Sequence, residues 1–431
     1  MGILAAYDTA GIQNYIFASN KLAENVGGSK LVADIFDKLL PEVIGEATDQ
    51  PVADWRGGGA LNRALRAELL YQGGGNAFVA FRDEPLFQAV TKAFLTRMCQ
   101  NAPGLGLAVA AIETEFEDTY KEDFDRLGKR LAIVKGGFNV PAFAGNQPIT
   151  KQSARTGAPA SSFAFKEFLS DSQVKKRERY AVYKSERGSE IDNFSDLAFD
   201  KGADSLIAII HADGNNMGRR IKASMSPFVS YAQAVPEIRA LSAKIDACYK
   251  AARARTISAF RSEYKRYLAG QKADFPAKKF RDEPPILELI GDGDDTTLVI
   301  GGRFALDFAA RLLREIEKTP AAERPFADSA LTACAGVVLF HDHYPFSDAY
   351  TLAEELCAEA KTSSRKCKQD GSCIDFHLHQ SGTVSGLRRL RERQYTVDGK
   401  KILCRPWRVS GGSSDAGTEN APPFEWFEKN I

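Results

Sequence analysis

The sequence has no apolar run that approaches the length of a membrane span, and its N-terminus lacks the basic segment and apolar core of a secretory leader. A transmembrane helix needs about 20 consecutive apolar residues, and a leader begins with a charged segment. We therefore expect a cytoplasmic protein with no membrane partner.

Cysteine is scarce, and no two cysteines have the CxxC spacing of a zinc site: the 431 residues include seven of them. We interpret most of them as buried thiols of a reduced compartment. Cys367 and Cys373 lie in a polar stretch, where a metal or redox role stays open beside the more common packing role.

The chain also lacks an excess of either charge, because 57 Lys and Arg are balanced by 56 Asp and Glu. A net charge of +1 creates no overall field that would draw the protein to a polyanion or a membrane surface. The length and a 44% hydrophobic content suit two or three domains with substantial cores. Any binding to a polyanion must then depend on local groups.

The most distinctive stretch is residues 287–300, where two apolar runs flank the turn Asp292-Gly293-Asp294-Asp295. This pattern predicts a strand, a tight turn and a second strand. Adjacent carboxylates repel one another by roughly 1 kcal/mol or more unless a cation or a proton lies between them. The turn is therefore either exposed to water, since Asp and Gly favour turns for backbone reasons, or holds a divalent metal.

The expected elements occur in the same order twice, as a strand, a helix, a hairpin, a helix and a strand, which is the ferredoxin-like order. In the first copy these elements cover residues 3–7, 31–40, 68–81, 85–100 and 106–114. In the second copy they cover residues 205–212, helical segments up to 268, 287–300, 304–318 and 330–340, followed by a helix at 347–361 and a strand at 374–378. The fold class is therefore α+β with two ferredoxin-like domains.

We divide the chain into a first domain at 1–139, a linker or insertion at 140–203, a second domain at 204–380 and a partly disordered extension at 381–431. The insertion contains no cysteine, and we expect its charge run at residues 175–179 to be a solvated helix face. Gly27 and Gly28 are expected to shape a loop.

The two copies differ in their acids. Asp8 ends the first strand of one copy as Asp213 does in the other, and the turn Gly73-Gly74-Gly75-Asn76 corresponds to the acidic turn. The first copy therefore has a glycine turn that lets backbone approach a ligand closely, whereas the second keeps its carboxylates.

Asp213 is expected to face Asp294 and Asp295, because the end of the first strand and the central hairpin meet in a ferredoxin-like domain. Three carboxylates form an oxygen-rich site suited to Mg²⁺ or Mn²⁺, and such ions support phosphoryl transfer from a triphosphate. The segment from Asp213 to Gly218 begins a helix whose N-terminal amides can hold phosphate. Lys361 is placed to reach phosphate from the helix before it.

These motifs resemble the palm polymerase subunit of type III CRISPR complexes, which is related to GGDEF-type nucleotide cyclases. The resemblance covers most of residues 1–380. It rests in the second copy on residues 212–218, 292–295, 336–338, 343–345 and 358–361, and in the first copy on residues 11–17, 27–30 and 73–76.

The resemblance implies two palm domains packed face to face as a pseudo-dimer, with ATP bound at their interface. It implies a nucleotidyltransferase that joins ATP or related NTPs through 3′-hydroxyl attack on an α-phosphate and makes a cyclic oligo- or dinucleotide messenger in antiviral defence. The implied catalytic residues are Asp213, Asp294 and Asp295, which with Gly214 are also the implied ligands of Mg²⁺ or Mn²⁺. The implied nucleotide-binding residues are Gly73, Gly74, Gly75, Asn76, Asn215, Asn216, Gly218, Gly293 and Lys361.

The chain departs from the family pattern at several points, which indicates a shortened, stand-alone form. Asp292 replaces the first glycine of the usual Gly-Gly-Asp-Asp turn, and Asn215 stands where many relatives have a second acid. The first palm begins at the N-terminus, which leaves no room for an upstream HD nuclease domain. The insertion has no zinc cysteines, and only about 50 residues follow the second palm.

Other interpretations stay open. The protein is alternatively a non-catalytic nucleotide- or RNA-binding palm subunit of a CRISPR-like ribonucleoprotein, because a fold alone does not fix a function. A diguanylate or mononucleotide cyclase is a third option. RNA, CRISPR-like subunits and a second copy of the chain are the further partners left open. The pairs His341 with His343 and His377 with His379 each share a strand face, where metal binding competes with an ordinary strand-end role.

Overall fold

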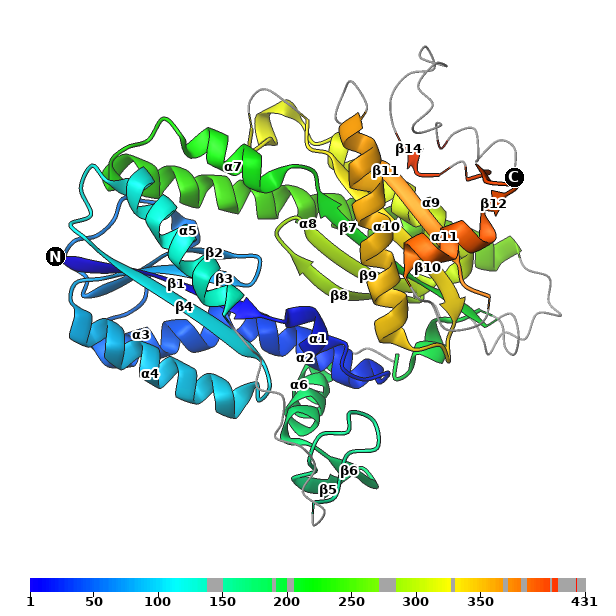
Figure 1. Cartoon of the computed structure of the whole chain (residues 1–431), viewed down its shortest axis with the longest axis horizontal. Helices are drawn as coiled ribbons and strands as arrows, with labels where there is room; N and C mark the ends of the chain where they lie inside the picture. Colours follow the sequence, from blue (N-terminus) through cyan, green and yellow to red (C-terminus); the bar gives the residue numbers. More distant parts are fainter. Residues whose placement is uncertain are drawn as a thin grey trace. The chain divides into compact units, whose positions relative to one another are not determined.

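The structure is a computed structural model that describes residues 1–137, 150–187, 191–199, 205–270, 284–326, 330–366, 371–380, 386–403, 405–409 and 424. Contacts within the chain group it into two compact units (Figure 1). The first unit comprises Met1–Glu190 with Gly218–Ala243, and the second comprises Ile191–Met217 with Lys244–Ile431. The four-part division made from the sequence stays a prediction beside this grouping.

The first unit is built on a four-stranded antiparallel sheet with the order β2-β3-β1-β4. Its central strand β1 is the most buried, and Leu4, Ala5, Ala6 and Tyr7 are fully covered. The elements are β1 (Gly2–Ala10), α1 (Ile12–Ile16), α2 (Leu22–Asp34), a π-helical turn (Ile35–Leu39), α3 (Leu40–Thr48), β2 (Ala67–Gly73), β3 (Asn76–Phe81), α4 (Glu84–Asn101), β4 (Gly106–Thr114), α5 (Tyr120–Gly136), β5 (Ser162–Ala164), β6 (Glu167–Leu169) and α6 (Asp171–Arg187).

The second unit has a six-stranded sheet with the order β14-β11-β10-β7-β9-β8, in which β11 runs parallel to β10 and the other neighbours are antiparallel. Its elements are β7 (Leu206–Gly214), β8 (Ile286–Asp292), β9 (Asp295–Gly301), α9 (Ala305–Glu317), β10 (Ala333–His341), α10 (Phe346–Lys366), β11 (Cys373–Leu378), α11 (Leu387–Gln394), β12 (Thr396–Val397), β13 (Lys400–Lys401) and β14 (Trp407–Arg408). Helices α7 (Met217–Met225) and α8 (Tyr231–Gly270) cross the division between the units.

The predicted ferredoxin-like order is confirmed in both units. The strands β8-β9-β7-β10 of the second sheet repeat the order β2-β3-β1-β4 of the first. Each central hairpin also carries an irregularity at the same distance before its turn, between Leu69 and Tyr71 in one and between Glu288 and Ile290 in the other. The repeat therefore extends to the register of the strands.

Two expectations for the first unit are wrong, and they have one cause. Gly27 and Gly28 lie inside helix α2 rather than in a loop. A Cβ atom on Gly27 would lie 1.8 Å from the backbone oxygen of Lys176 in α6, so the glycine allows the two helices to approach closely. The sequence indicates a helix at residues 175–179 but not its packing against α2, because the two helices lie far apart along the chain.

The charge run at residues 175–179 is correspondingly not a solvated face. Lys176 is 3% exposed, donates a hydrogen bond to the backbone oxygen of Tyr15 and lies 4.0 Å from the centroid of the Tyr15 ring. Burial lowers the pKa of Lys176 to about 8. Arg179 pairs with Asp34 of α2 at 2.6 Å, so this side of α6 is an internal packing surface.

Cys373 is a buried thiol, as expected for most of the cysteines, and it packs with Cys334, Cys357 and Ala360. Cys367 and the stretch at 410–423 that we expect to be disordered lie outside the described residues. Within the described part of the chain, no helix combines the length and apolarity needed to cross a membrane.

The close approach of α2 and α6 predicts different effects for two helical glycines of the same unit. Gly27→Ala should lower the unfolding temperature, because an added methyl group at a tight helix contact costs about 1–3 kcal/mol. Gly128→Ala in α5 is the control, since no atom lies within 4 Å of its added Cβ, and alanine should stabilise that exposed helix by about 0.5–1 kcal/mol. Equal stability of both variants in thermal unfolding would show that α6 does not pack as described.

Candidate functional site

The acidic turn joins β8 and β9 as the sequence predicts. Asp292 pairs with Asp295 across the hairpin, which leaves Gly293 and Asp294 as the two loop residues. Gly293 has a φ of 55°, a left-handed conformation that glycine adopts without steric cost. The tight turn therefore lifts Asp294 and Asp295 at the end of the hairpin.

Strand β7 brings Asp213 to this turn. Ala212 pairs with Thr296 of β9, so Asp213 continues the strand alongside Asp295. A Cβ atom on Gly214 would lie 2.8 Å from Oδ2 of Asp294 and 2.6 Å from the hydroxyl of Tyr249. The Asp294 carboxylate thus lies directly over the backbone of Gly214, and the structure brings together the three predicted acids.

The site holds more negative charge than its surroundings offset. Burial, and after it the neighbouring charge of Asp213, raise the pKa of Asp294 to about 7. Burial also raises the pKa of Asp295 to about 7, with Asp213 and then Asp292 contributing. Near neutral pH, Asp294 and Asp295 are therefore each close to half protonated, and a bound cation would displace their protons.

Lys361 also lies at this site, where it contacts the carboxylate of Asp213. It comes from the last turns of α10, and its Nζ atom donates a hydrogen bond to Oδ2 of Asp213. Its positive charge lowers the pKa of both Asp294 and Asp295. The predicted role of Lys361 in phosphate binding stays a prediction.

Two further residues support the hairpin, and sequence reasoning missed both. Arg253 on α8 donates to the backbone oxygen of Gly291 at 2.9 Å and to Oγ1 of Thr296 at 3.1 Å, and it is 4% exposed. It holds the two strands of the hairpin from the side of the helix. No local pattern indicates this residue, because its partners lie about 40 residues away.

The second is His211, whose Nδ1 atom lies 3.2 Å from Oγ1 of Thr297 and 3.5 Å from Oδ1 of Asp295. Burial lowers the pKa of His211, so the ring is neutral near pH 7. Its position two residues before Asp213 on the same strand places it on the same sheet face, which is a signal that the sequence offered.

The predicted nucleotide-binding residues after Asp213 have different positions. The amide nitrogen of Asn215 donates to Oγ1 of Thr332 at 3.1 Å and to the backbone oxygen of Gly371 at 3.3 Å, and Asn215 is 5% exposed. This side chain ties together the segments that precede β10 and β11. Asn216 has a φ of 55°, and Gly218 opens a segment grouped with the first unit; nucleotide binding by these three residues stays a prediction.

The glycine turn of the first unit has the predicted correspondence. Gly73 pairs with Asn76 and Asp8 pairs with Asn76, so Gly75 stands where the second unit has Asp294. A Cβ atom on Gly75 would lie 2.8 Å from Oγ1 of Thr9 and 2.5 Å from Cδ1 of Ile12. Thr9, the counterpart of Gly214, thus fills the space that the Asp294 carboxylate fills in the second unit.

The repeat includes an ion pair that sequence reasoning did not predict. Lys135 of α5 lies 2.9 Å from Oδ2 of Asp8, as Lys361 of α10 meets Asp213. Both lysines lie on the helix that follows the fourth strand of their unit. The pairing of a strand-end aspartate with a lysine is therefore common to both units, whereas the hairpin carboxylates belong to the second alone.

The residues at the acidic turn fit a divalent cation by their chemistry. Oδ1 of Asp295 is buried and accepts no hydrogen bond from any described residue, and hard cations take carboxylate oxygens. Among the described residues, no group of three or more carboxylate, histidine or cysteine side chains is arranged so that it could hold a metal ion. Asp213 has Lys361 as its cation in this arrangement.

The two histidine pairs, His341 with His343 and His377 with His379, are not arranged as metal sites. His343 is exposed, whereas burial followed by the charge of Arg405 lowers the pKa of His377 to about 4. His341 lies 3.1 Å from Asp342. In the described part of the chain these residues form no metal cluster, so the ordinary strand-end interpretation describes them better.

Comparison with known proteins agrees with this geometry. Residues 206–368 match the sequence profile of the second palm domain of Cas10/Cmr2, a range that runs from the start of β7 to just beyond α10. No curated protein matches the sequence significantly. Residues 206–368 are therefore a Cas10-like palm.

Solved structures extend the likeness to both units. The Csm1–Csm4 cassette in complex with pppApA matches with a TM-score of 0.53 and 16% identity over 86% of this chain and 54% of that chain. The cassette in complex with cA4 matches with a TM-score of 0.53 and 16% identity over 88% of this chain and 54% of that chain. The Csm1–Csm4 subcomplex of the type III-A CRISPR-Csm interference complex matches with a TM-score of 0.53 and 16% identity over 93% of this chain and 56% of that chain. This likeness shows the fold, and the chain spans about half the length of these proteins.

The raised pKa of Asp294 predicts a pH-dependent gain from its removal. Its pKa is about 7 in the folded protein and about 3.9 in an unfolded chain, so the carboxylate lowers stability increasingly as pH rises from about 4 to 7. With all metal chelated, Asp294→Asn should therefore unfold at a higher temperature than the wild type, by more at pH 8 than at pH 5.

Asp398→Asn, at an exposed turn of the same unit, is the control for losing one negative charge. Each kcal/mol corresponds to about 2–4 °C for a unit of this size, which thermal unfolding resolves. A gain for Asp294→Asn that is the same at both pH values would contradict the electrostatic origin.

Proposed function

We propose that this protein is a metal-dependent nucleotidyltransferase that makes a cyclic oligo- or dinucleotide from ATP or a related NTP. The observation that carries the proposal is the placement of Asp294 over Gly214 and beside Asp213, with an oxygen of Asp295 left without a donor among the described residues. The first unit has the same fold and register without these hairpin carboxylates. A scaffold has no need for such repulsion on one side of a repeat.

Asp213, Asp294 and Asp295 would hold Mg²⁺ or Mn²⁺, and the Gly214 carbonyl is a further candidate ligand. Such an ion neutralises phosphate charge and lowers the pKa of an attacking hydroxyl. In the transfer a bond forms between the 3′-oxygen and the α-phosphorus, the bond to the β-phosphate breaks, and pyrophosphate leaves while the hydroxyl proton goes to water. Arg253 keeps the hairpin in place during this exchange.

Lys361 has a role that depends on the bound state. It neutralises Asp213. If a divalent cation were bound to Asp213, the ammonium group would be available to a phosphate oxygen, because lysine is a flexible point charge. The contact with Asp213 would thus hold Lys361 close to the position where the triphosphate would bind.

The similar structures support this substrate class. Csm1–Csm4 cassettes have been solved with AMPPNP, pppApA and cA4, and the subcomplex belongs to a CRISPR interference complex. By analogy we propose adenine nucleotides as substrates, CRISPR-like subunits as partners and antiviral defence as the setting. The second unit supplies the chemistry, and the turn Gly73 to Asn76 is proposed as part of a second nucleotide site.

A non-catalytic palm that binds nucleotide or RNA is the second candidate. The contact between Lys361 and Asp213 favours it, since a lysine already takes the place of a cation on one of the three acids. Tight NTP binding without turnover, together with copurified RNA, would support this function over synthesis.

Turnover distinguishes the two candidates. The full chain, incubated with four NTPs and Mn²⁺ or Mg²⁺, should give a cyclic product that mass spectrometry identifies. Asp294→Ala/Asp295→Ala should lose at least about 100-fold of this activity, because metal contacts to the transition state are worth several kcal/mol. Asp398→Asn should match the wild type, and an unchanged product profile in the double variant would refute the catalytic assignment.

Metal binding is tested separately by thermal unfolding at pH 8. Adding millimolar Mn²⁺ should raise the unfolding temperature of the wild type, because a ligand of the folded state alone stabilises it. Asp295→Asn should respond less, since it lacks a ligand charge. Equal shifts in both proteins would place the ion elsewhere.

A further inference from the structure

A small hairpin of the first unit exposes three aromatic side chains. Strands β5 and β6 pair antiparallel, with Phe163 opposite Phe168 and their ring centroids 5.0 Å apart. Phe163 is 65% exposed, Phe165 at the tip 69% and Phe168 43%. We call residues 162–169 the phenylalanine hairpin. Its exposed apolar side chains contribute little to a core, so folding does not explain them.

The tip of the phenylalanine hairpin is also unfavourable for its residues. Phe165 and Lys166 have φ values of 53° and 62°, in the left-handed region where two-residue hairpin turns prefer Asn-Gly. An aromatic and a long basic residue thus occupy a strained turn. The Phe165 ring is exposed, and the guanidinium of Arg177 lies 5.4 Å from its centroid. Strain that is kept at a surface position is a reason to look for a function there.

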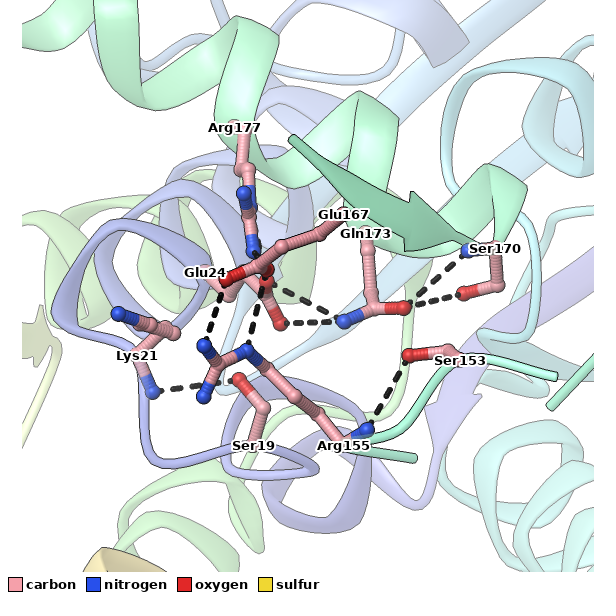
Figure 2. A network of polar contacts seen from close by, with 9 residues as sticks. All are labelled: Ser19, Lys21, Glu24, Ser153, Arg155, Glu167, Ser170, Gln173 and Arg177. Atoms are coloured by element: carbon pink, nitrogen blue, oxygen red, sulfur yellow. Dashed lines mark hydrogen bonds and ion pairs between the residues drawn. The ribbon is translucent and has the colours of Figure 1, made fainter. Parts of the chain in front are cut away.

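A polar network, buried at Glu24 and Gln173 and part-exposed at Arg155 and Glu167, fixes this hairpin to the helices of its own unit (Figure 2). Arg155 lies 2.7 Å from Glu167 of β6, and Arg177 of α6 lies 2.8 Å from Glu167 and 2.7 Å from Glu24 of α2. Gln173 donates to both oxygens of Glu24 at 3.3 and 3.2 Å. The base of the hairpin is therefore anchored to α2 and α6 by ion pairs and hydrogen bonds.

The network also determines the charge around the rings. Glu167 is the only acid in residues 150–170, and its two arginines lower its pKa to about 2. Lys151 and Lys166 are exposed, and Nζ of Lys151 lies 5.4 Å from the centroid of the Phe168 ring. Aromatic faces and two ammonium groups that pair with no carboxylate among the described residues thus share one surface.

The size and composition of this surface distinguish its possible ligands. Three partly exposed phenylalanines offer on the order of 300–400 Å² of apolar area, below the about 800 Å² that each partner gives to a stable protein interface. Bases stack on aromatic rings one at a time, and nearby cations attract the phosphates. A few nucleotides therefore fit this surface better than a folded protein does.

We propose that the phenylalanine hairpin binds single-stranded nucleic acid, with bases stacked on Phe163, Phe165 and Phe168 and phosphates held by Lys151 and Lys166. The site lies in the first unit, and the proposal does not depend on the chemistry of the acidic turn. Binding of this kind needs no particular sequence, because every base has a flat face. It would recruit RNA or DNA to a chain with almost no net charge.

The test uses the full chain and fluorescein-labelled 12-nucleotide single strands, one of RNA and one of DNA, in anisotropy titrations at 50 mM salt. Phe165→Asn should weaken binding by about 5-fold to 100-fold, the range for losing one stacked base. Because Asn tolerates the left-handed turn better than Phe, this variant should unfold at the same or a higher temperature than the wild type. Loss of binding then does not report loss of folding.

Phe165→Tyr keeps the ring and should bind within about twofold of the wild type. Ile133→Gln removes another exposed apolar side chain of the first unit, which is 76% exposed on α5, and should leave binding unchanged. Lys166→Gln should reduce the slope of log affinity against log salt by about 0.7, the value for one phosphate contact to a single strand.

Binding of either strand that depends on Phe165 and is restored by tyrosine supports the proposal. The proposal is overturned if neither strand binds, or if Phe165→Asn binds as tightly as the wild type. It is also overturned if sedimentation shows a dimer that Phe165→Asn dissociates without any change in strand binding, because the hairpin is then an interface between copies of the chain.

Discussion

The second unit is arranged around the mutual repulsion of three carboxylates. Asp213 lies at the end of β7, and Asp294 and Asp295 lie at the turn between β8 and β9. Two surrounding cations limit that repulsion. Lys361 neutralises Asp213 directly, and the charge of Arg253 on α8 lowers the pKa of Asp295. His211 adds no compensating charge, because burial lowers its pKa and keeps the ring neutral. What they leave uncompensated is a pair of acids with pKa values of about 7, which is the charge that a divalent cation would offset.

The first unit shows how little must change to remove this constraint. The strand order, the register and the ion pair between a strand-end aspartate and a lysine are the same in both units. The difference is which of two neighbouring residues carries a side chain and which is a glycine. Thr9 occupies the space beside Gly75, whereas the Asp294 side chain occupies the space beside Gly214. A carboxylate at position 75 would collide with Thr9 and Ile12. The turn of the first unit can therefore bring its own backbone close to a ligand, but it has no room for an acidic side chain.

The sequence predicted what depends on local pattern and strand register. The acidic hairpin, the position of Asp213 and the correspondence with Gly75 follow from alternating apolar residues and from the repeat. Features made by distant partners were missed. Arg253 and Lys135 contact strands far along the chain, and the charge run at 175–179 looked solvated because its partners on α2 lie about 150 residues away. The helical Gly27 was mistaken for a loop residue, since only the backbone of α6 explains it.

Glu24 and Asp295 show how the satisfaction of hydrogen bonds separates a structural role from a chemical one. Glu24 is 1% exposed, yet Gln173 and Arg177 donate to its carboxylate, so its charge is fully compensated and it serves to hold α2, α6 and the phenylalanine hairpin together. Asp295 has an oxygen that receives no hydrogen bond within the described residues, and its pKa is raised rather than lowered. In the described part of the chain, buried oxygens without a hydrogen-bond partner also occur on Asp246 and Asp342, but the Asp295 oxygen lies beside two further carboxylates. Because native folds rarely leave buried polar atoms without partners, this is the oxygen that we expect to meet a cationic ligand.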